Sequence, residues 1–248
     1  TPTKLKPSKS GRLFWQSIEA HGGLDRWFSN GPIFFRFTYA PKGERFVRDT
    51  YQTIDTWSSK ARHELATDRS KEFGWTGEQA WYASGLEKVD INPRFWSLTP
   101  YYFVAMPFVL ADPGVDLAYL GETEVDGKTW PTVEVTFDEG TGDAPDDYYI
   151  VYFDPDTKRV HGLRYVVTYR GFFPEGGQSP EKYMRYEGEQ SVEGITLAEK
   201  YPTYKWNEDD GEVGKLVTGI ELSEVEFRPD VEKDYFDKPE GAEVQKEP

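Results

Sequence analysis

The chain has 248 residues, no cysteine and a formal net charge of −15. The lack of cysteine excludes disulfide bonds, zinc–thiolate centres and thiol nucleophiles. The acidity argues against nucleic acid and anionic membrane surfaces as partners, and solubility is its simplest role. Only 37% of the residues are hydrophobic, but 16% are Phe, Trp or Tyr, whose large side chains can build a core.

The N-terminal part of the chain predicts a lead-in followed by helices. Residues 1–9 are polar and cationic, and we expect them to be flexible. The chain begins at Thr1 rather than Met, so we expect that a preceding segment has been removed, which could carry an export signal or a membrane tether. Ser10 is predicted to cap a helix that runs to Ala20 and stops at Gly22-Gly23, with a second helical turn at 24–28.

Blocks that alternate apolar and polar residues follow the helices. Ile33, Phe35, Phe37 and Tyr39 share one face of the first block, as in a half-buried antiparallel strand. Short turns between successive blocks favour an up-and-down antiparallel sheet. The predicted strands cover residues 33–39, 45–55, 60–66, 71–75, 79–83, 116–125, 129–138, 147–154, 159–170, 182–192, 195–206 and 215–228.

Two local features of these strands can be predicted closely. Asp126-Gly127 is a signal for a tight hairpin, because both residues tolerate a positive φ. The last strand has apolar residues at even positions up to Leu222 and at odd positions from Val225. A strand of period two cannot keep both sets on one face without an extra residue, which predicts a β-bulge near Ser223-Glu224.

Residues 90–112 interrupt the strand pattern and form the most apolar stretch of the chain. Pro93, Pro100 and Pro107 argue against one continuous helix or a central strand. We therefore predict two short helices that lie across a face of the sheet and line a cavity, because so many apolar side chains would form a large exposed patch in water.

No residue pattern fixes a reaction. His21, His63 and His161 are isolated and lack metal spacing, so we predict structural roles for them. Asp154 and Asp156 begin like a calcium loop, but Lys158 stands where a third oxygen ligand belongs. We expect no metal, no cofactor and no catalytic residue, and binding rather than catalysis. Paired carboxylates for glycoside cleavage stay open, because their separation cannot be read from a sequence.

Several motifs resemble those of a group of uncharacterised exported bacterial proteins, and the order of elements over residues 10–228 resembles the lipoprotein-carrier (LolA/LolB-like) superfamily. The motifs lie at 20–27, 101–112, 119–122, 125–128, 133–137 and 152–157. The resemblance implies a curved, incomplete antiparallel barrel plugged by helices. It also implies binding of an apolar ligand or acyl chain, and a place in the bacterial periplasm or at the outer membrane.

We therefore predict a mainly β protein with a single half-barrel domain over residues 10–237, a frayed tail over 238–248 and a monomeric state. The predicted function is non-catalytic binding of a hydrophobic or lipid-like small molecule. The expected cavity residues are Trp57, Trp75, Trp81, Phe95, Trp96, Phe103, Met106 and Phe108.

Two other functions stay open at this point. A carbohydrate-binding protein or glycoside-active enzyme would use exposed aromatic side chains and carboxylates. A structural or partner-binding module would need neither. A deep apolar cavity favours the lipid-like ligand, whereas a flat exposed aromatic strip near paired carboxylates favours sugar.

Overall fold

The computed structural model describes residues 8–43, 46–86, 91–138, 141–142, 144, 146–207 and 209–246. One antiparallel sheet of thirteen strands dominates it, in the spatial order β15-β5-β4-β3-β2-β1-β14-β13-β10-β9-β8-β7-β6. The first part of the chain contributes β1 (Ile33–Pro41), β2 (Arg48–Ile54), β3 (Ala61–Leu65), β4 (Asp68–Trp75) and β5 (Ala80–Tyr82). The middle contributes β6 (Val115–Val125), β7 (Lys128–Phe137), β8 (Tyr149–Phe153), β9 (Val160–Tyr165) and β10 (Lys182–Arg185). The last part adds β13 (Thr203–Asn207), β14 (Glu212–Phe227) and β15 (Glu243–Val244), while β11 (Gln190–Val192) and β12 (Ile195–Leu197) pair only with each other.

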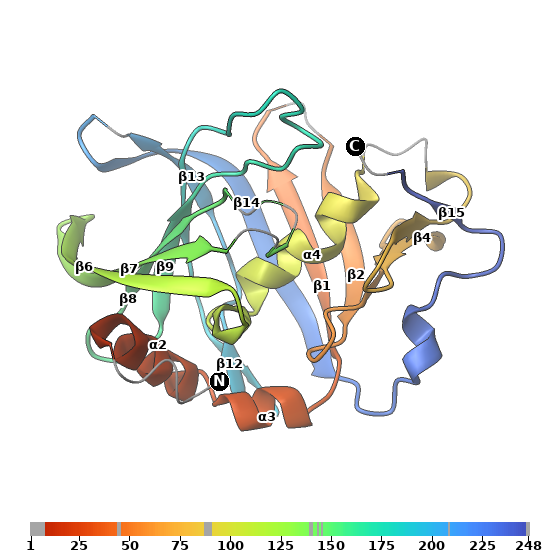
Figure 1. Cartoon of the computed structure of the whole chain (residues 1–248), viewed down its shortest axis with the longest axis horizontal. Helices are drawn as coiled ribbons and strands as arrows, with labels where there is room; N and C mark the ends of the chain where they lie inside the picture. The colour runs from red at the N-terminus through yellow and green to blue at the C-terminus, as the bar shows by residue number, and fades with distance from the viewer. Residues whose placement is uncertain are drawn as a thin grey trace.

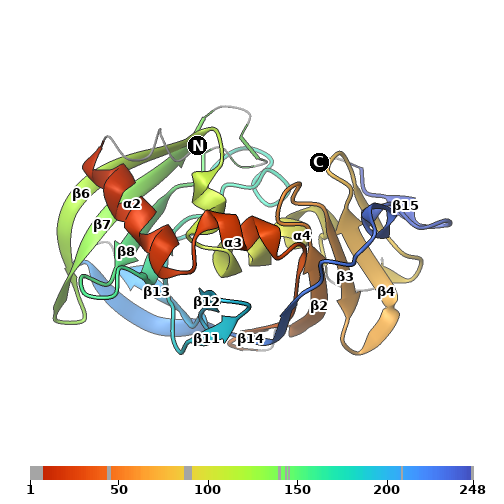
Figure 2. The ribbon, with the colours of Figure 1, turned by 90° about the horizontal axis from the view of Figure 1, so that it is seen from below.

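The large sheet curls into an incomplete barrel, as predicted. Figure 2 shows it as an open ring around the helices, and its end strands β15 and β6 do not pair with each other. Helix α4 (Pro93–Val104) crosses the concave face in Figure 1, and α2 (Lys9–Ala20) and α3 (Leu24–Ser29) lie along the open side. Two short 3-10 helices, η2 (Phe108–Ala111) and η3 (Lys233–Phe236), complete the set of described helices.

The main core lies between these helices and the concave face of the sheet. Ile33, Phe35 and Phe37 of β1 are at most 2% exposed, which confirms the predicted alternation along that strand. Phe14 of α2 and Trp27 of α3 are equally buried and belong to the same hydrophobic cluster. The amphipathic helices therefore bury their apolar faces against the sheet, as layer packing requires.

The first helix starts earlier than predicted. Its N-cap is Ser8, whose Oγ accepts the backbone N–H of Gly11 at 2.9 Å. Ser10, the predicted cap, lies inside the helix and donates its hydroxyl to the carbonyl of Leu117 in β6 at 3.0 Å. The predicted stop at Gly22-Gly23 is confirmed, because both glycines have positive φ values, of 121° and 87°.

The predicted hairpin and bulge are both present. Val125 pairs with Lys128, so Asp126 and Gly127 form a two-residue turn with φ values of 54° and 72°. In β14 the pairing with β1 shifts by one residue around Glu224, which has a φ of 53°. This extra residue lets Ile220 and Leu222 before the bulge and Val225 and Phe227 after it face the same core, whereas Leu216 is exposed.

Three predicted strands are shorter or divided. The strand predicted over 159–170 ends at Tyr165, because the backbone N–H groups of Val167 and Thr168 are bound by the side chains of Ser179 and Asp147. The segments predicted over 182–192 and 195–206 are each two short strands. Their inner parts, β11 and β12, leave the large sheet and form a separate hairpin.

Helix α4 runs through Pro100, one of the three prolines that argued against one continuous helix. Proline removes one backbone donor, but α4 is only 12 residues long and stays helical on both sides of it. Pro107 lies between α4 and η2, so the prediction of two short helices on a sheet face is confirmed.

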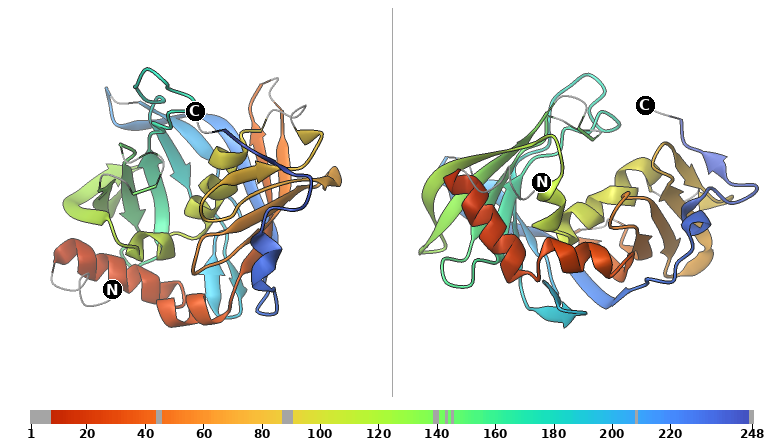
Figure 3. Two further views of the ribbon diagram at one scale, coloured as in Figure 1. Left: turned by 45° about the vertical axis from the view of Figure 1, so that its right-hand side comes forward. Right: turned by 60° about the horizontal axis from the view of Figure 1, so that its bottom comes forward.

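The C-terminal segment is attached to the sheet, which corrects the prediction of a frayed tail for residues 243–245. Glu243 and Val244 form β15 on the free edge of β5, and Gln245 donates its backbone N–H to Ala80 at 2.8 Å. Figure 3 shows this segment along the outside of the β2–β5 half of the barrel. A short tail can be fixed in this way because the edge of β5 offers unpaired backbone groups.

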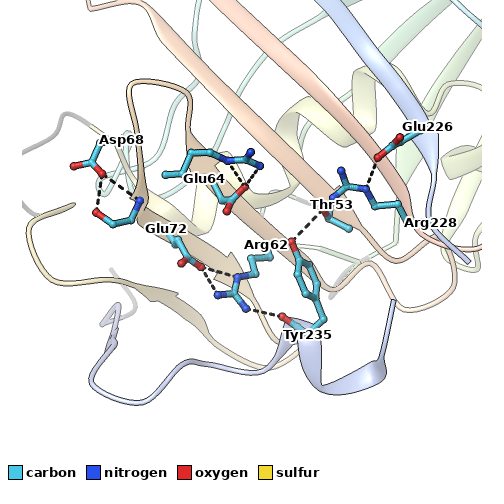
Figure 4. A network of polar contacts seen from close by, with 10 residues as sticks. Thr53, Arg62, Glu64, Asp68, Glu72, Glu226, Arg228 and Tyr235 are labelled. Carbon is cyan, nitrogen blue, oxygen red and sulfur yellow. Dashed lines mark hydrogen bonds and ion pairs between the residues drawn. The ribbon is translucent and has the colours of Figure 1, made fainter. Parts of the chain in front are cut away.

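Polar contacts fasten η3, which precedes β15 in the chain, to the outer face of β2, β3 and β4. The carbonyl of Tyr235 accepts a hydrogen bond from Arg62 at 3.1 Å, and Arg62 is also paired with Glu72 through a bond of 2.6 Å (Figure 4). The hydroxyls of Tyr235 and Thr53 lie 3.4 Å apart. The end of the chain is thus held by both backbone pairing and side-chain contacts.

Candidate functional site

A cavity of about 120 Å³ lies on the concave side of the sheet, between α4 and the strands β7, β8 and β9. Helix α4 packs on β3, β4 and β5, which form the other half of the barrel. The cavity is therefore the space that α4 leaves on its far side. Its position depends on the curl of the sheet, which brings the two halves to opposite sides of one helix.

Aromatic side chains dominate the wall of this cavity, with seven of its sixteen lining residues. Tyr149 and Tyr165 are direct cross-strand partners on β8 and β9. The ring of Phe137 meets Tyr149 edge-on at 5.6 Å, and the ring of Phe103 lies 5.1 Å from Tyr165. The aromatic lining residues are Phe95, Tyr102, Phe103, Phe137, Tyr149, Tyr165 and Tyr169.

Among the described residues of the cavity wall, Asp147 is the one carboxylate. It lies two residues before β8, and its Oδ1 accepts the backbone N–H of Thr168 at 2.6 Å and the Thr168 hydroxyl at 2.8 Å. Burial raises the pKa of Asp147 above its usual value, although the bonds from Thr168 work in the opposite direction. Among the described residues, no lysine or arginine forms an ion pair with it.

The phenol of Tyr149 is another polar group of this wall. The residue is only 8% exposed and lines the cavity, yet its hydroxyl makes no hydrogen bond within the described part of the chain. Burial and the nearby charge of Asp147 raise its pKa well above the ordinary value, so the group is a neutral donor. The hydroxyl is open to the cavity, where it can donate to water or to a ligand.

Arg94, at the start of α4, is the cation of the lining. Its guanidinium lies 3.6 Å from the ring centroid of Trp75, in a cation–π contact. This contact draws the side chain toward β4 rather than toward the strands that carry Asp147. The two charged groups of the wall therefore belong to opposite halves of the barrel.

Two hydrogen bonds from other parts of the chain hold helix α4 in place. Nε2 of His63 in β3 donates to the carbonyl of Ser97 at 2.9 Å, and burial lowers the pKa of His63 to about 3, so the imidazole is neutral. The hydroxyl of Tyr186 donates to the carbonyl of Phe103 at 2.8 Å. These bonds hold the middle of α4 at Ser97 and its C-terminal turn at Phe103.

Of the eight residues predicted from the sequence to line a cavity, Phe95 and Phe103 do so. Met106 and Phe108 follow α4 but are 1% exposed and belong to the main core, where Phe108 stacks on Trp27 at 4.5 Å. Trp96 faces the other half of the barrel, where its ring meets Tyr39 at 4.9 Å.

The three remaining tryptophans lie outside the cavity wall. Trp75 holds Arg94, as described above. Trp81 is fully buried, but its strand partner is Gly74 whereas Trp75 pairs with Ala80, so the two tryptophans occupy opposite faces of the sheet. Trp57 is 72% exposed and stacks on Phe28 at 4.4 Å.

The sequence interpretation missed the tyrosines and the carboxylate of the wall. Tyr149 and Tyr165 occupy core-facing positions of strands with an alternating pattern, and this pattern could have indicated them as cavity residues. The prediction selected the tryptophans instead, because of their size. Asp147 stands at the end of an acidic loop, and nothing local distinguishes it from Asp146.

A second hollow of about 520 Å³ lies between the start of α2 and β6. None of its lining residues is aromatic, and its wall carries Asp112, Asp116 and Asp138. The aromatic cavity is therefore the better candidate for an apolar ligand.

The described residues contain no group of three or more His, Cys, Asp or Glu side chains placed to hold a metal ion. No described helix is long and apolar enough to span a membrane.

Comparison with solved structures confirms the fold. A LolA superfamily protein from Nitrosomonas europaea superimposes with a TM-score of 0.60 at 12% identity, over 93% of this chain and 98% of that chain. A DUF1329 family protein from Desulfovibrio piger gives a TM-score of 0.58 at 12% identity, over 92% and 97% of the two chains. A domain from Vibrio parahaemolyticus, described as an outer membrane lipoprotein-sorting protein, gives 0.55 at 13% identity, over 92% and 97%.

At these identities the likeness concerns the fold, which is the LolA-like incomplete barrel expected from the sequence. No curated protein matches the chain in sequence. Residues 62–217, which carry strands from both halves of the barrel and the whole of α4, match a family defined by sequence. The chain belongs to this family, the family of unknown function DUF6503.

Proposed function

We propose that this protein binds a hydrophobic or lipid-like ligand in the bacterial cell envelope, without chemical conversion of the ligand. The observation that supports this most directly is the aromatic cavity beneath α4. Ligand sites are typically concave and mostly apolar, with a few polar groups that fix orientation. Here those groups are Asp147, Tyr149 and Arg94.

The envelope location is supported by the kind of protein that shares the fold, since one solved relative is described as an outer membrane lipoprotein-sorting protein. A carbohydrate site has less support. Among the described residues, Trp57 is the one tryptophan or tyrosine in the set of exposed large hydrophobic side chains, so these residues present no exposed strip of sugar-stacking rings.

The volume of the cavity limits the size of the ligand that it can enclose. Its volume of about 120 Å³ is below the roughly 300–1,000 Å³ of pockets that enclose a drug-sized ligand. The present shape therefore accommodates one end of a ligand. A longer apolar chain requires α4 to move with β3–β5, away from β7–β9, so that the gap between the two halves widens.

The proposal is tested by titrating the protein with an uncharged fluorescent probe, N-phenyl-1-naphthylamine. We expect saturable binding that Leu98→Trp abolishes, because Leu98 lines the cavity and a larger ring would fill it. Leu216→Trp is the matched control, since Leu216 lies on β14 outside the cavity and is 36% exposed. Equal binding by the wild type and both variants would place the probe elsewhere and contradict the proposal.

A further inference from the structure

The cavity combines an aromatic wall with a carboxylate, and this combination favours a particular type of ligand head group. Four rings, those of Phe103, Phe137, Tyr149 and Tyr165, contact one another in pairs along the wall. The faces of aromatic rings carry negative electrostatic potential, and boxes of such rings bind ammonium groups. A purely apolar ligand would not require a carboxylate beside them.

Asp147 adds an uncompensated negative charge to this wall. Its Oδ1 is held by two hydrogen bonds from Thr168, so the carboxylate is fixed in place rather than free to turn into solvent. No described lysine or arginine neutralises it. Removing a carboxylate from water without a counter-charge is costly, and a cationic ligand would offset that cost.

The hydroxyl of Tyr149, which has no hydrogen-bond partner among the described residues, also suits a cationic ligand. Tyr149 is more than nine-tenths buried, lines the cavity and follows Asp147 by two residues. Its ring can face a cation while its O–H donates to an ester, hydroxyl or phosphoryl oxygen next to the ammonium group of an amphiphile.

The protein already holds one ammonium group against this set of rings. Nζ of Lys182 lies 5.6 Å from the ring centroid of Tyr165, although Lys182 does not line the cavity. Arg94 does line it, but its guanidinium is stacked on Trp75 in the other half of the barrel. A ligand cation at Asp147 would therefore lie at the wall that has rings and a carboxylate, where no cation of the described residues is paired with that carboxylate.

From these contacts we propose that the cavity binds the cationic head group of an amphiphile, a primary or quaternary ammonium, with Asp147 as its counter-charge and the rings of Phe137, Tyr149 and Tyr165 around it. This inference rests on the proposed function. The overall charge of −15 favours the approach of such a ligand and disfavours a fatty-acid anion.

Displacement of N-phenyl-1-naphthylamine by three amphiphiles of equal chain length tests the proposal. Decyltrimethylammonium, decanol and decanoate are compared below their micelle concentrations, at pH 7.5 and constant ionic strength. We expect decyltrimethylammonium to bind roughly tenfold more tightly than decanol, which corresponds to one desolvated cation–π and charge contact. Decanoate should bind most weakly of the three.

The variant Asp147→Asn should remove most of this preference, measured as the ratio of the affinities for decyltrimethylammonium and decanol. The amide oxygen of asparagine can still accept both bonds from Thr168, so the wall keeps its shape, which a thermal melt would verify. Asp146→Asn is the matched control, because it changes the net charge by the same amount at the adjacent, exposed position. That control should retain the full preference.

The possible results separate the two proposals. Equal displacement by all three amphiphiles overturns the head-group inference and leaves the proposed function standing. A stronger effect of decanoate also overturns it and places the head group at Arg94. An equal loss of preference in both aspartate variants indicates only the general surface charge and overturns it as well. If the probe does not bind the native protein at all, both proposals fail.

Discussion

The side-chain oxygen of Gln245 accepts the backbone N–H of Arg94 at 2.7 Å, which joins the end of the chain to the first turn of α4. The amide nitrogen of Gln245 also donates to Oδ1 of Asn92 at 3.1 Å, and the same oxygen caps α4 by accepting the N–H of Phe95. The first N–H groups of a helix have no partner within it. A residue about 150 positions away in the chain thus completes the cap of the helix that covers the cavity.

Replacing Gln245 with alanine should loosen the start of α4. We expect the amides of Arg94 and Phe95 to exchange faster, with local protection reduced by about 1 kcal/mol, the usual effect of losing a helix cap. Hydrogen exchange followed by NMR would measure this. Glu240→Ala is the control, because Glu240 is exposed and no described contact depends on it. Unchanged exchange in Gln245→Ala would show that Asn92 suffices as the cap.

Phe95 and Trp96 are neighbours on α4 with different expected roles. Phe95 lines the cavity and meets Tyr169 at 5.4 Å and the half-exposed Phe172 at 4.7 Å. Trp96 lies outside the cavity lining and packs beside Leu65 and Phe73. Phe95→Ala should weaken binding of the uncharged probe more than Trp96→Ala does. Trp96→Ala should lower the melting temperature more than Phe95→Ala does. Probe titration and thermal melts of both variants provide the comparison, and a reversed ranking would contradict this assignment.

His21 should make the stability of the fold sensitive to mild acid. Its Nδ1–H donates to the carbonyl of Thr196 at 2.8 Å and its Nε2 accepts the N–H of Val160, an arrangement that requires a neutral ring. Burial lowers the pKa of His21 to about 4. The unfolded chain binds the proton near pH 6.5 and the folded protein does not, so the free energy of unfolding falls as pH decreases from 6.5 toward 4.

By this linkage His21 should cost about 2 kcal/mol of stability between pH 7.5 and pH 5. Urea unfolding at the two pH values would measure the loss. His21→Gln cannot titrate in this range, so it should be less stable at pH 7.5 but should lose less on acidification than the wild type. The same loss in both proteins would exclude His21 as the source, and His63 could then be substituted in the same way.

Gly74 should be intolerant of any side chain. A Cβ atom built on it would lie 2.2 Å from the carbonyl oxygen of Ala61 and 2.8 Å from the ring of Trp81. Gly74→Ala should therefore destabilise the protein by roughly 1–3 kcal/mol, as overpacking in a core does. Gly219→Ala is the control, because the nearest atom to its Cβ, the oxygen of Ala40, is 3.9 Å away. Denaturant unfolding of both variants tests the difference. Equal stability would show that the backbone of β3 can move away from the added methyl group.

Much of the fold follows from local patterns that hold in isolation. The alternation in β1, the Asp126-Gly127 turn and the bulge at Glu224 each depend on the geometry of a few neighbouring residues, so all three could be predicted. The end of β9 at Tyr165 could not be predicted from local residues. The strand ends where Asp147, distant in sequence, takes the N–H of Thr168.

The sequence by itself therefore determined that the chain forms a curved antiparallel sheet with an apolar insert across it, because hydrophobic periodicity and turn chemistry are local properties. Only the tertiary structure decided which side chains surround the cavity. The curl of the sheet and the placement of α4 on β3–β5 left the space beside Tyr149 and Tyr165, whereas Trp81 turned to the opposite face and Trp57 to the surface. A one-residue shift along a strand reverses the face of a side chain, and the distance between two strands is set by packing, so neither could be read from residue type alone.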